Sequence, residues 1–457
     1  MTGTAWTGEA RARFDAYVEW LKAFCRIQSI SATGEGIGGA VDHLAARIKD
    51  LGGEVEVLRL EGANPAVLAT FSPDGATARA GARKTLLFYD HYDVQPADPL
   101  DEWTGDPFEP QVRNGKFYAR GAADNKGDLI SRLAAVDLVR RRGGLPCTVK
   151  FFIEGEEEIG SPSLERYVER YREKLAADAC IWETGSRDPG ERIHLFLGLK
   201  GIAYLELSVR TASVDLHSSY GAIVDAASNR LVRALATLRN SLGEIQIPGF
   251  YDEVIPPGPD VRRAVEQIPF ETEAYRKTFG VAGFTRGREG AAALAALLLE
   301  PSCTICGIES GYTGEGAKTV LPREAVAKVD FRLVPNQSPD HVVERLRHHL
   351  DMHGYGDVEV KVLAGERPYR TNLSDPFVEI VRSVAEEATG RRVCVYPNHY
   401  GSGPMYPIGS TLGVPIVSVG TAYWDSRPHA PDENIRLSDF QETIALMAAL
   451  IDRFGRA

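Results

Sequence analysis

The amino-acid sequence predicts an α/β fold with a mostly parallel, mixed sheet covered by helices on both faces. Three observations lead to this prediction. Strand-like apolar runs alternate with helical segments from about residue 85 to 205, and a further strand-like run lies near residue 416. Between these two regions, strand-like segments instead alternate apolar and polar residues. That pattern indicates a smaller α+β domain inserted into the α/β domain.

The first strand of the alternating region is the apolar run Leu86-Leu87-Phe88-Tyr89. The segments expected in this region are strand 85–89, helix 126–142, strand 148–153, helix 164–175 and strand 179–182. The helix over 126–142 is rich in leucine and alanine and ends at Gly143-Gly144. Because strand–helix alternation is typical of βαβ units, the sheet should be mainly parallel.

Both ends of the chain are predicted to be helical. Apolar residues between Phe14 and Cys25 recur at three- and four-residue spacing, as on one face of an amphipathic helix. Near the other end, strand 415–420 precedes a helix that starts at Ser438, where Ser438-x-x-Gln441 matches a capping box. A further helix is expected over 40–50. The glycine-rich segment before it follows no strand, so it does not predict a dinucleotide site.

The length of the chain predicts more than one domain, because 457 residues exceed the ~250–300 that one hydrophobic core supports. Segments 203–210 and 325–334 alternate in the manner of half-exposed antiparallel strands, and helices are expected over 222–241 and 339–353. The expected parts are residues 1–205 as the first part of the α/β domain, 206–370 as the inserted domain and 371–457 as the second part.

Composition excludes several classes of function. A net charge of −11 argues against nucleic-acid binding, which usually needs a basic face. No apolar run is long enough to span a membrane, and the N-terminus lacks the basic and apolar regions of a secretory leader. Six cysteines scattered through a long chain are typical of reduced thiols, so we expect a cytoplasmic protein.

Two groups of possible metal ligands are interpreted as structural. Cys303-x-x-Cys306 lies in a strand-like run and has no second cysteine pair at ligand spacing. Four histidines fall on one predicted helix or at its end and are expected on a solvated face: His341, His348, His349 and His353.

Acids and histidines follow the ends of several α/β strands. Because the carboxyl ends of parallel strands meet along one edge of a sheet, these side chains should converge. The converging residues are expected to be His91, Asp93, Asp124, the acidic run 154–158, Glu183 and His429. Two histidines and several carboxylates without cysteine suit zinc, manganese or cobalt, and so many carboxylates need cations to offset their repulsion.

Three motifs resemble those of a known family. They are His-Tyr-Asp-Val-Gln-Pro at 91–96, Arg-Gly-x-x-Asp-x-Lys-Gly at 120–127 and Glu-Gly-x-Glu-Glu-x-Gly-Ser at 154–161. In this order they resemble the co-catalytic di-zinc metallopeptidases that include carnosinases, cytosolic dipeptidases and aminoacylases (metallopeptidase family twenty). The resemblance runs through nearly the whole chain and is nearest the dipeptidase branch. It implies a phosphorylase/hydrolase-like catalytic domain and an inserted lid or dimerisation domain.

The resemblance implies a site for two Zn²⁺ ions, with Mn²⁺ or Co²⁺ as alternatives. His91 and Glu183 would bind one ion, and Glu158 and His429 the other. Asp124 would bridge the two.

The resemblance also implies the chemistry of this site. A hydroxide between the two metal ions would attack a peptide bond, with Glu157 as general base. Asp93 would lie behind the metal ligand His91 and orient it.

Four residues outside the metal site are expected to contact substrate. Arg332 and Thr319 lie in segments that resemble those that grip a substrate's C-terminal carboxylate. Ser402 lies in a loop that resembles one lining the same pocket. His217, in Asp215-Leu216-His217-Ser218, resembles a histidine that reaches substrate across a dimer interface. The chain is therefore expected to form a homodimer through the inserted domain.

Alternatives remain open for the substrate. The leading hypothesis is a dipeptidase acting on small peptides, and the second is a deacylase of acetyl- or succinyl-amino acids. A non-catalytic small-molecule binding protein on the same scaffold is a third. Two residues depart from the family pattern: Asp90 adds a negative charge where glycine is usual, and His399 precedes the Gly401-Ser402-Gly403-Pro404 loop.

Overall fold

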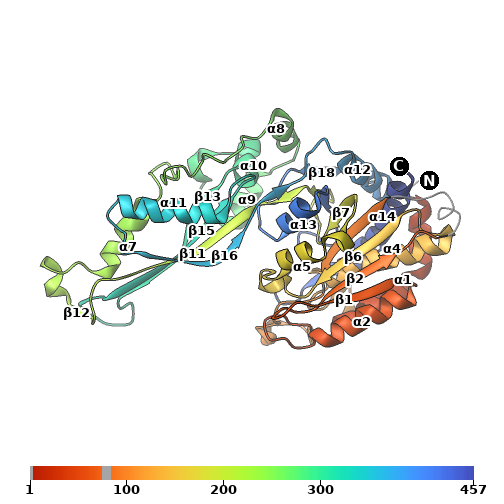
Figure 1. The fold of residues 1–457 in the computed structure, drawn as a ribbon, viewed down its shortest axis with the longest axis horizontal. Coiled ribbons are helices and arrows are strands. Elements are labelled where there is room, and N and C mark those ends of the chain that lie inside the picture. The colour runs from red at the N-terminus through yellow and green to blue at the C-terminus, as the bar shows by residue number, and fades with distance from the viewer. Residues whose placement is uncertain (1–3, 75–83) are drawn as a thin grey trace. The chain divides into compact units, whose positions relative to one another are not determined.

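The computed structural model of the protein describes residues 4–74 and 84–457 (Figure 1). The chain divides into two compact units. Unit 1 contains Met1–Gly198, Thr371–Pro397 and Pro404–Ala457, and unit 2 contains Leu199–Arg370 and Asn398–Gly403. Unit 1 is therefore assembled from segments that are far apart in the sequence, whereas most of unit 2 is one continuous stretch.

Unit 1 is built on a mixed sheet that has nine strands among the described residues, in the order β1-β2-β6-β3-β7-β19-β9-β18, with β8 paired to β9. The strands are β1 Glu54–Leu58, β2 Ala66–Phe71, β3 Thr85–His91, β6 Thr148–Glu154, β7 Ala179–Trp182, β8 Ser186–Arg187, β9 Ile193–Phe196, β18 Val393–Tyr396 and β19 Ile416–Ser418. The central strands β6, β3, β7 and β19 run parallel, while β1 and β2 form an antiparallel edge. The predicted α/β class is confirmed.

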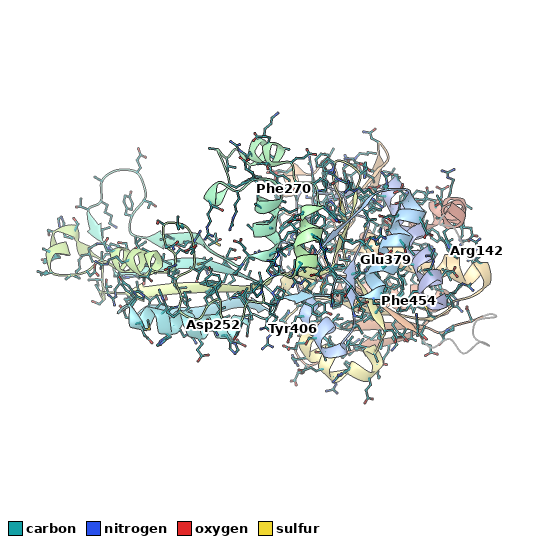
Figure 2. All side chains as sticks on the ribbon, turned by 90° about the horizontal axis from the view of Figure 1, so that it is seen from above. Arg142, Asp252, Phe270, Glu379, Tyr406 and Phe454 are labelled. Atoms are coloured by element: carbon teal, nitrogen blue, oxygen red, sulfur yellow. The ribbon has the colours of Figure 1, made fainter. Side chains whose placement is uncertain are left out.

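Helices of unit 1 form two groups. One group shares the main hydrophobic core: α1 Thr4–Cys25, α2 Ile37–Asp50, α4 Lys126–Gly143, α12 Pro376–Thr389 and α14 Leu437–Arg456. The second group consists of α5 Leu164–Arg170, α6 Arg172–Leu175 and α13 Met405–Leu412, which contact one another. Within the first group, Phe454 of α14 (labelled in Figure 2) packs edge-on against Phe377 of α12, with ring centroids 5.6 Å apart.

Helix α4 lies deep in unit 1. Every residue from Lys126 to Val139 is buried, including the charged Asp128 and Arg132. Buried charges are costly unless they have partners. The polar residues of this helix must therefore be paired with groups on the surrounding strands and loops.

Unit 2 contains a four-stranded antiparallel sheet in the order β13-β15-β11-β16, counted over the described part of the chain. Its strands are β11 Gly201–Arg210, β13 Ser302–Ser310, β15 Glu324–Leu333 and β16 Glu359–Glu366. Residues of β11 alternate between buried and half-buried, as the sequence predicts. The buried face packs against α7 Ala227–Ala236 and α11 Pro339–Met352, and the two helices and the sheet form a second core.

The remaining elements are short. In unit 1, a small sheet joins β4 Gln111–Arg113, β5 Lys116–Tyr118 and β20 Asn434–Arg436. In unit 2 the further helices are α8 Pro259–Glu266, α9 Thr272–Phe279 and α10 Gly290–Leu299. The other short strands are β10 Gly198–Leu199, β12 Leu216–His217, β14 Val320–Leu321 and β17 Tyr369–Arg370. No described helix is both long enough and apolar enough to cross a membrane.

Several local predictions are wrong in detail. The capping box is one: α14 begins at Leu437, so Ser438 lies inside the helix, and Arg436 at the N-cap forms no side-chain cap. Helix 164–175 is interrupted at Tyr171, and helix 222–241 is shorter than predicted. His349 is fully buried rather than solvated, and its Nε2 lies 2.8 Å from the hydroxyl oxygen of Thr237.

Candidate metal centre

His91 ends strand β3 and is fully buried. Its Nδ1 atom lies 3.0 Å from the backbone oxygen of Asp93 and 3.4 Å from Asp93 Oδ1. Its Nε2 atom lies 3.0 Å from Asp124 Oδ1. Because oxygens that face Nδ1 favour a proton on that nitrogen, Nε2 keeps the lone pair that a metal ion requires.

The carboxylate of Asp124 lies between two histidines. Its Oδ1 faces His91, and its Oδ2 lies 3.2 Å from His429 Nε2. A glutamate accompanies each histidine: Glu183 Oε2 lies 3.6 Å from His91 Nε2. Glu158 Oε2 lies 3.0 Å from His429 Nε2. The structure thus brings the five ligands predicted from the sequence into two groups that share Asp124.

The donor set fits divalent metal ions. Both carboxylate oxygens of Glu158 and Oε2 of Glu183 are buried, and apart from the imidazoles of His429 and His91 beside them they have no donor among the described residues. Buried carboxylates without a partner are costly, and a cation between them would remove that cost. His91, Asp124 and Glu158 each offer an atom within 4.8 Å of the others. Imidazole and carboxylate ligands without thiolate suit zinc, manganese or cobalt.

The electrostatics of the cluster favour positive charge. Burial opposes the charged form of His91, but the carboxylates of Glu183 and Asp124 outweigh it and raise the pKa of His91 well above its usual value. Hydrogen bonds in which Asp124 and Glu158 accept from the imidazole raise the pKa of His429 to about 10. Burial opposes ionisation of Asp124, but its two histidine neighbours hold the pKa of Asp124 below its ordinary range. The cluster therefore attracts protons or metal cations.

Glu157 lies in a 3₁₀ turn, Glu157–Ile159, directly after strand β6. Desolvation, reinforced by the negative charges of Asp124 and Glu158, raises the pKa of Glu157 well above its ordinary value. Bound cations would offset part of this effect, because they neutralise the neighbouring carboxylates. A carboxylate with a raised pKa can both take up and return a proton near neutral pH.

Comparison with known proteins identifies the family. Residues 87–453 match the family model described as Peptidase family M20/M25/M40. The chain belongs to this family. The match spans more than half of the chain and contains all the residues of the metal centre described above.

Relatives place the chain in the dipeptidase branch of these metallopeptidases, as its motifs predicted. It is 34% identical over 404 residues to Cys-Gly metallodipeptidase dug1 of Schizosaccharomyces pombe, covering 85% of this chain and 82% of that protein. It is 29% identical over 382 residues to Beta-Ala-His dipeptidase of Rattus norvegicus, covering 80% of this chain and 76% of that protein. Among solved structures, the M20 family metallo-carboxypeptidase Sso-CP2 from Sulfolobus solfataricus has a TM-score of 0.90 at 37% identity. The match covers 96% of this chain and 99% of that one.

Asp93 links the two halves of the M20 metal centre. Its Oδ1 and backbone oxygen face His91, and its Oδ2 accepts the backbone N–H of Glu158 at 3.0 Å. Gln95 also donates to the Glu158 backbone oxygen at 2.8 Å. Asp93 therefore contacts His91 of the first group and also fixes the turn that carries Glu158 of the second.

Glu433 is a supporting residue that sequence reasoning missed. Its buried carboxylate accepts a hydrogen bond from Arg120 at 2.7 Å. It also accepts the backbone N–H groups of Gly121, Ala123 and Asp124, at 3.0, 2.8 and 3.0 Å. Four donors on one carboxylate fix the loop that presents Asp124. Its position four residues after His429 was the available signal.

The loop around His429 has an unusual backbone. Arg427, His429 and Asp432 have positive φ angles of 54°, 61° and 56°, a conformation that is uncommon outside glycine. Asp432 holds this loop through the backbone and hydroxyl donors of Thr104, at 3.0 and 2.5 Å. The side chain of His429 is 53% exposed, whereas that of His91 is 0% exposed.

The two departures from the family pattern have structural partners. Asp90 is fully buried, and its Oδ1 lies 2.5 Å from Nη1 of the equally buried Arg132, so the carboxylate faces a positive charge. His399 Nδ1 accepts the backbone N–H of Gly401 at 3.0 Å, and its ring stacks on Tyr400. His399 therefore helps to shape the loop that carries Ser402.

The four expected substrate-binding residues lie in unit 2, in two pairs. Arg332 donates to the Ser402 hydroxyl at 2.9 Å. His217 belongs to β12, and the following residue donates its N–H to the Thr319 backbone oxygen at 3.0 Å. Arg332 pairs in register with Ile202 at the start of β11, whereas β12 follows the end of that strand. The two pairs therefore lie at opposite ends of the four-stranded sheet.

Glu366 shares a sheet face with Arg332. Both residues pair in register with Ile202, one from each side, so their side chains project from the same face. Burial outweighs the nearby Arg332 charge and raises the pKa of Glu366 from 4.5 to about 7. Glu366 Oε2 is buried and accepts no hydrogen bond from the described residues. Its ionised form is thus disfavoured in the folded protein.

Stability should depend on pH through Glu366. Between pH 4.5 and about 7, the folded state keeps a proton that the unfolded state has lost, so the free energy of unfolding should fall as pH rises. The Glu366→Gln variant should not show this fall, and at pH 8 its free energy of unfolding should exceed that of wild type by at most about 3 kcal/mol. Denaturant unfolding at a series of pH values measures the effect.

The matched control is Glu359→Gln, because Glu359 lies on the same strand but is exposed. Its stability should follow that of wild type at every pH. A constant difference in stability between wild type and Glu366→Gln from pH 4 to 8 would contradict the proposed burial effect.

Proposed function

We propose that this M20 peptidase hydrolyses the peptide bond of dipeptides, or of closely related substrates with a free carboxylate, using two divalent metal ions. One observation carries the proposal. The two oxygens of Asp124 each face a histidine, and each histidine has a glutamate beside it. Two three-residue sites that share a carboxylate match the requirements of a two-metal hydrolase.

The five ligands have distinct assignments. His91 and Glu183 would hold one metal ion, while His429 and Glu158 would hold the other. Asp124 would bridge both. When bound, the two ions would polarise the scissile carbonyl and lower the pKa of the attacking water. Zinc is the expected metal, with manganese or cobalt as alternatives that use the same ligands.

Glu157 is proposed as the general base. Its carboxylate takes a proton from the attacking water and then delivers that proton to the nitrogen of the departing amine. Desolvation keeps its pKa above that of a solvated glutamate, which makes the second transfer possible. Asp93 holds the ring of His91 through the oxygens that face Nδ1.

Unit 2 supplies the proposed substrate contacts. The guanidinium of Arg332 can bind a carboxylate through two parallel hydrogen bonds, which gives preference for substrates with a free carboxyl end. Ser402, which already contacts Arg332, and Thr319 are proposed as further contacts. His217 would donate to the oxyanion that forms when water attacks the carbonyl.

A homodimer would allow residues from the two ends of unit 2 to contact the same substrate. Ile202 and Arg210, which mark the ends of the relevant part of β11, are separated by about 26 Å at the usual rise per strand residue. Arg332 lies at one end of this strand and His217 beyond the other. A dipeptide is much shorter than that distance. We therefore propose that His217 reaches the substrate bound by a second copy of the chain.

A panel of substrates tests the proposed activity. We expect dipeptides to be cleaved much faster than acetyl- or succinyl-amino acids, and we expect a chelator to abolish cleavage until zinc, manganese or cobalt is restored. Metal analysis of the same preparations should find two equivalents per chain. Preferential cleavage of the acylated amino acids would replace the dipeptidase proposal with a deacylase.

Glu157→Gln tests the general base. Turnover should fall by about 10²–10⁴-fold, because the proton transfers lose their carrier. Metal content should stay at the wild-type level, because Glu157 is not among the proposed ligands. The control is Glu156→Gln, which keeps the oxygen that accepts the Asn64 N–H at 2.8 Å. Turnover of Glu157→Gln near the wild-type rate would refute this role.

A mixing experiment tests the shared site. Homodimers of Glu157→Gln and of His217→Ala should each be nearly inactive. Randomly exchanged subunits should recover about a quarter of wild-type activity, because half of the dimers are mixed and each mixed dimer has one intact site. Light scattering reports the dimer. An active monomer, or no recovery after proven subunit exchange, would contradict the proposal.

A further inference from the structure

The guanidinium of Arg132 joins three segments at the carboxyl edge of the central sheet. Arg132 lies in α4 and is 0% exposed. Its Nη1 donates to the backbone oxygen of Tyr89 at 3.0 Å. Its Nη2 donates to the backbone oxygens of Trp182 at 2.7 Å and Val419 at 3.4 Å. One buried side chain thus contacts the ends of β3 and β7 and the residue that follows β19.

These backbone oxygens adjoin residues of the metal centre. Tyr89 lies two residues before His91, and Trp182 lies directly before Glu183. His91 and Glu183 are the two residues assigned to the same metal ion. Arg132 therefore grips the backbone beside both of them.

Arg132 connects strands β3 and β7 just beyond the point where their pairing ends. The ladder between β3 and β7 runs from Leu86 opposite Ala179 to Phe88 opposite Ile181. Among the described residues, this pairing stops at Phe88 and Ile181, three residues before His91 and two before Glu183. Beyond this point the guanidinium joins the two strands by donating to one carbonyl on each.

Asp90 keeps this arginine charged and oriented. The two side chains are both 0% exposed, and Asp90 Oδ1 lies 2.5 Å from Arg132 Nη1. Asp128, one turn earlier on α4, adds further negative charge near the guanidinium and accepts the Thr421 N–H at 2.7 Å. A buried arginine without such partners would be strongly unfavourable. The aspartate before the metal-binding histidine thus has a function of its own.

We propose that Arg132, held by Asp90, is a positioning residue that sets the separation of His91 and Glu183 and so the affinity and geometry of the metal ion they share. The proposal rests on the ligand assignment of the proposed function. It assigns no contact with substrate to either residue. Outer residues that orient metal ligands commonly contribute 10- to 100-fold to metal affinity, as an order of magnitude.

Arg132→Lys is the first test, with metal binding measured directly. Lysine keeps the charge but cannot donate to the carbonyls of both strands and to Asp90 in one fixed geometry. Competition with a chromophoric chelator should show that one of the two zinc equivalents binds about 10- to 100-fold more weakly. The visible absorption of the Co²⁺-loaded protein should change, because it reports ligand geometry. We expect kcat to fall and KM to change little.

Arg187→Lys is the matched control. Arg187 is also a buried arginine of unit 1, 1% exposed, and it pairs with Asp439 and Glu442 of α14 at 3.4 and 3.6 Å. Its side chain makes no such contact with the ends of β3 and β7. A comparable loss of thermal stability in this variant, with zinc affinity and the Co²⁺ spectrum of wild type, would separate positioning from general destabilisation.

Asp90→Asn decides the matter if Arg132→Lys does not fold. Asparagine keeps an oxygen for the hydrogen bond but removes the counter-charge, so the same zinc equivalent should weaken by a smaller factor. Unchanged zinc affinities and an unchanged Co²⁺ spectrum in either folded variant would overturn the proposal. Wild-type protein that binds two metal ions but cleaves no dipeptide would instead refute the proposed function, because these metal-binding tests require no activity.

Discussion

Burial of negative charge at one edge of the central sheet is the constraint on which the rest of unit 1 depends. Carboxylates from four separate segments (Asp93, Asp124, Glu158 and Glu183) lie within 3.6 Å of two imidazoles, and several of their oxygens accept no hydrogen bond within the described part of the chain. Such a cluster is stable only if cations offset the repulsion and the desolvation. The parallel strand order makes the cluster possible, because it brings these segments to the same edge.

Three acids that are not proposed as ligands hold the ligands in place. Glu433 binds the loop of Asp124 through four donors. Asp93 connects His91 with the turn after β6. Asp90 holds the arginine that spans β3 and β7. Each acid accepts at least one buried donor, although Asp90 Oδ2 and Asp93 Oδ1 accept no hydrogen bond from the described residues. These bonds fix the positions of the segments that they join.

The sequence predicted the α/β class, the starts of the central strands and the residues of the metal cluster, because apolar runs and strand-end motifs are local signals. It did not predict the supporting pairs, because Asp90 and Arg132 lie 42 residues apart and Glu433 lies 313 residues from Arg120. No local pattern marks such contacts. The capping box at Ser438 is wrong although its local pattern is present, because the helix begins one residue earlier, at Leu437. Arg436, at the N-cap, forms an ion pair with Asp439 in the first turn.

The unequal exposure of the two histidines would make metal exchange at the proposed two-metal centre asymmetric. His91 is sealed inside unit 1, whereas half of the His429 side chain meets solvent on a loop with strained backbone angles. Exchange of a ligand or an ion is faster where water can enter and the protein can open locally. The ion beside His91 would then be the resident one. The ion beside His429 would exchange more readily, so its occupancy would follow the concentration of free metal ions in solution.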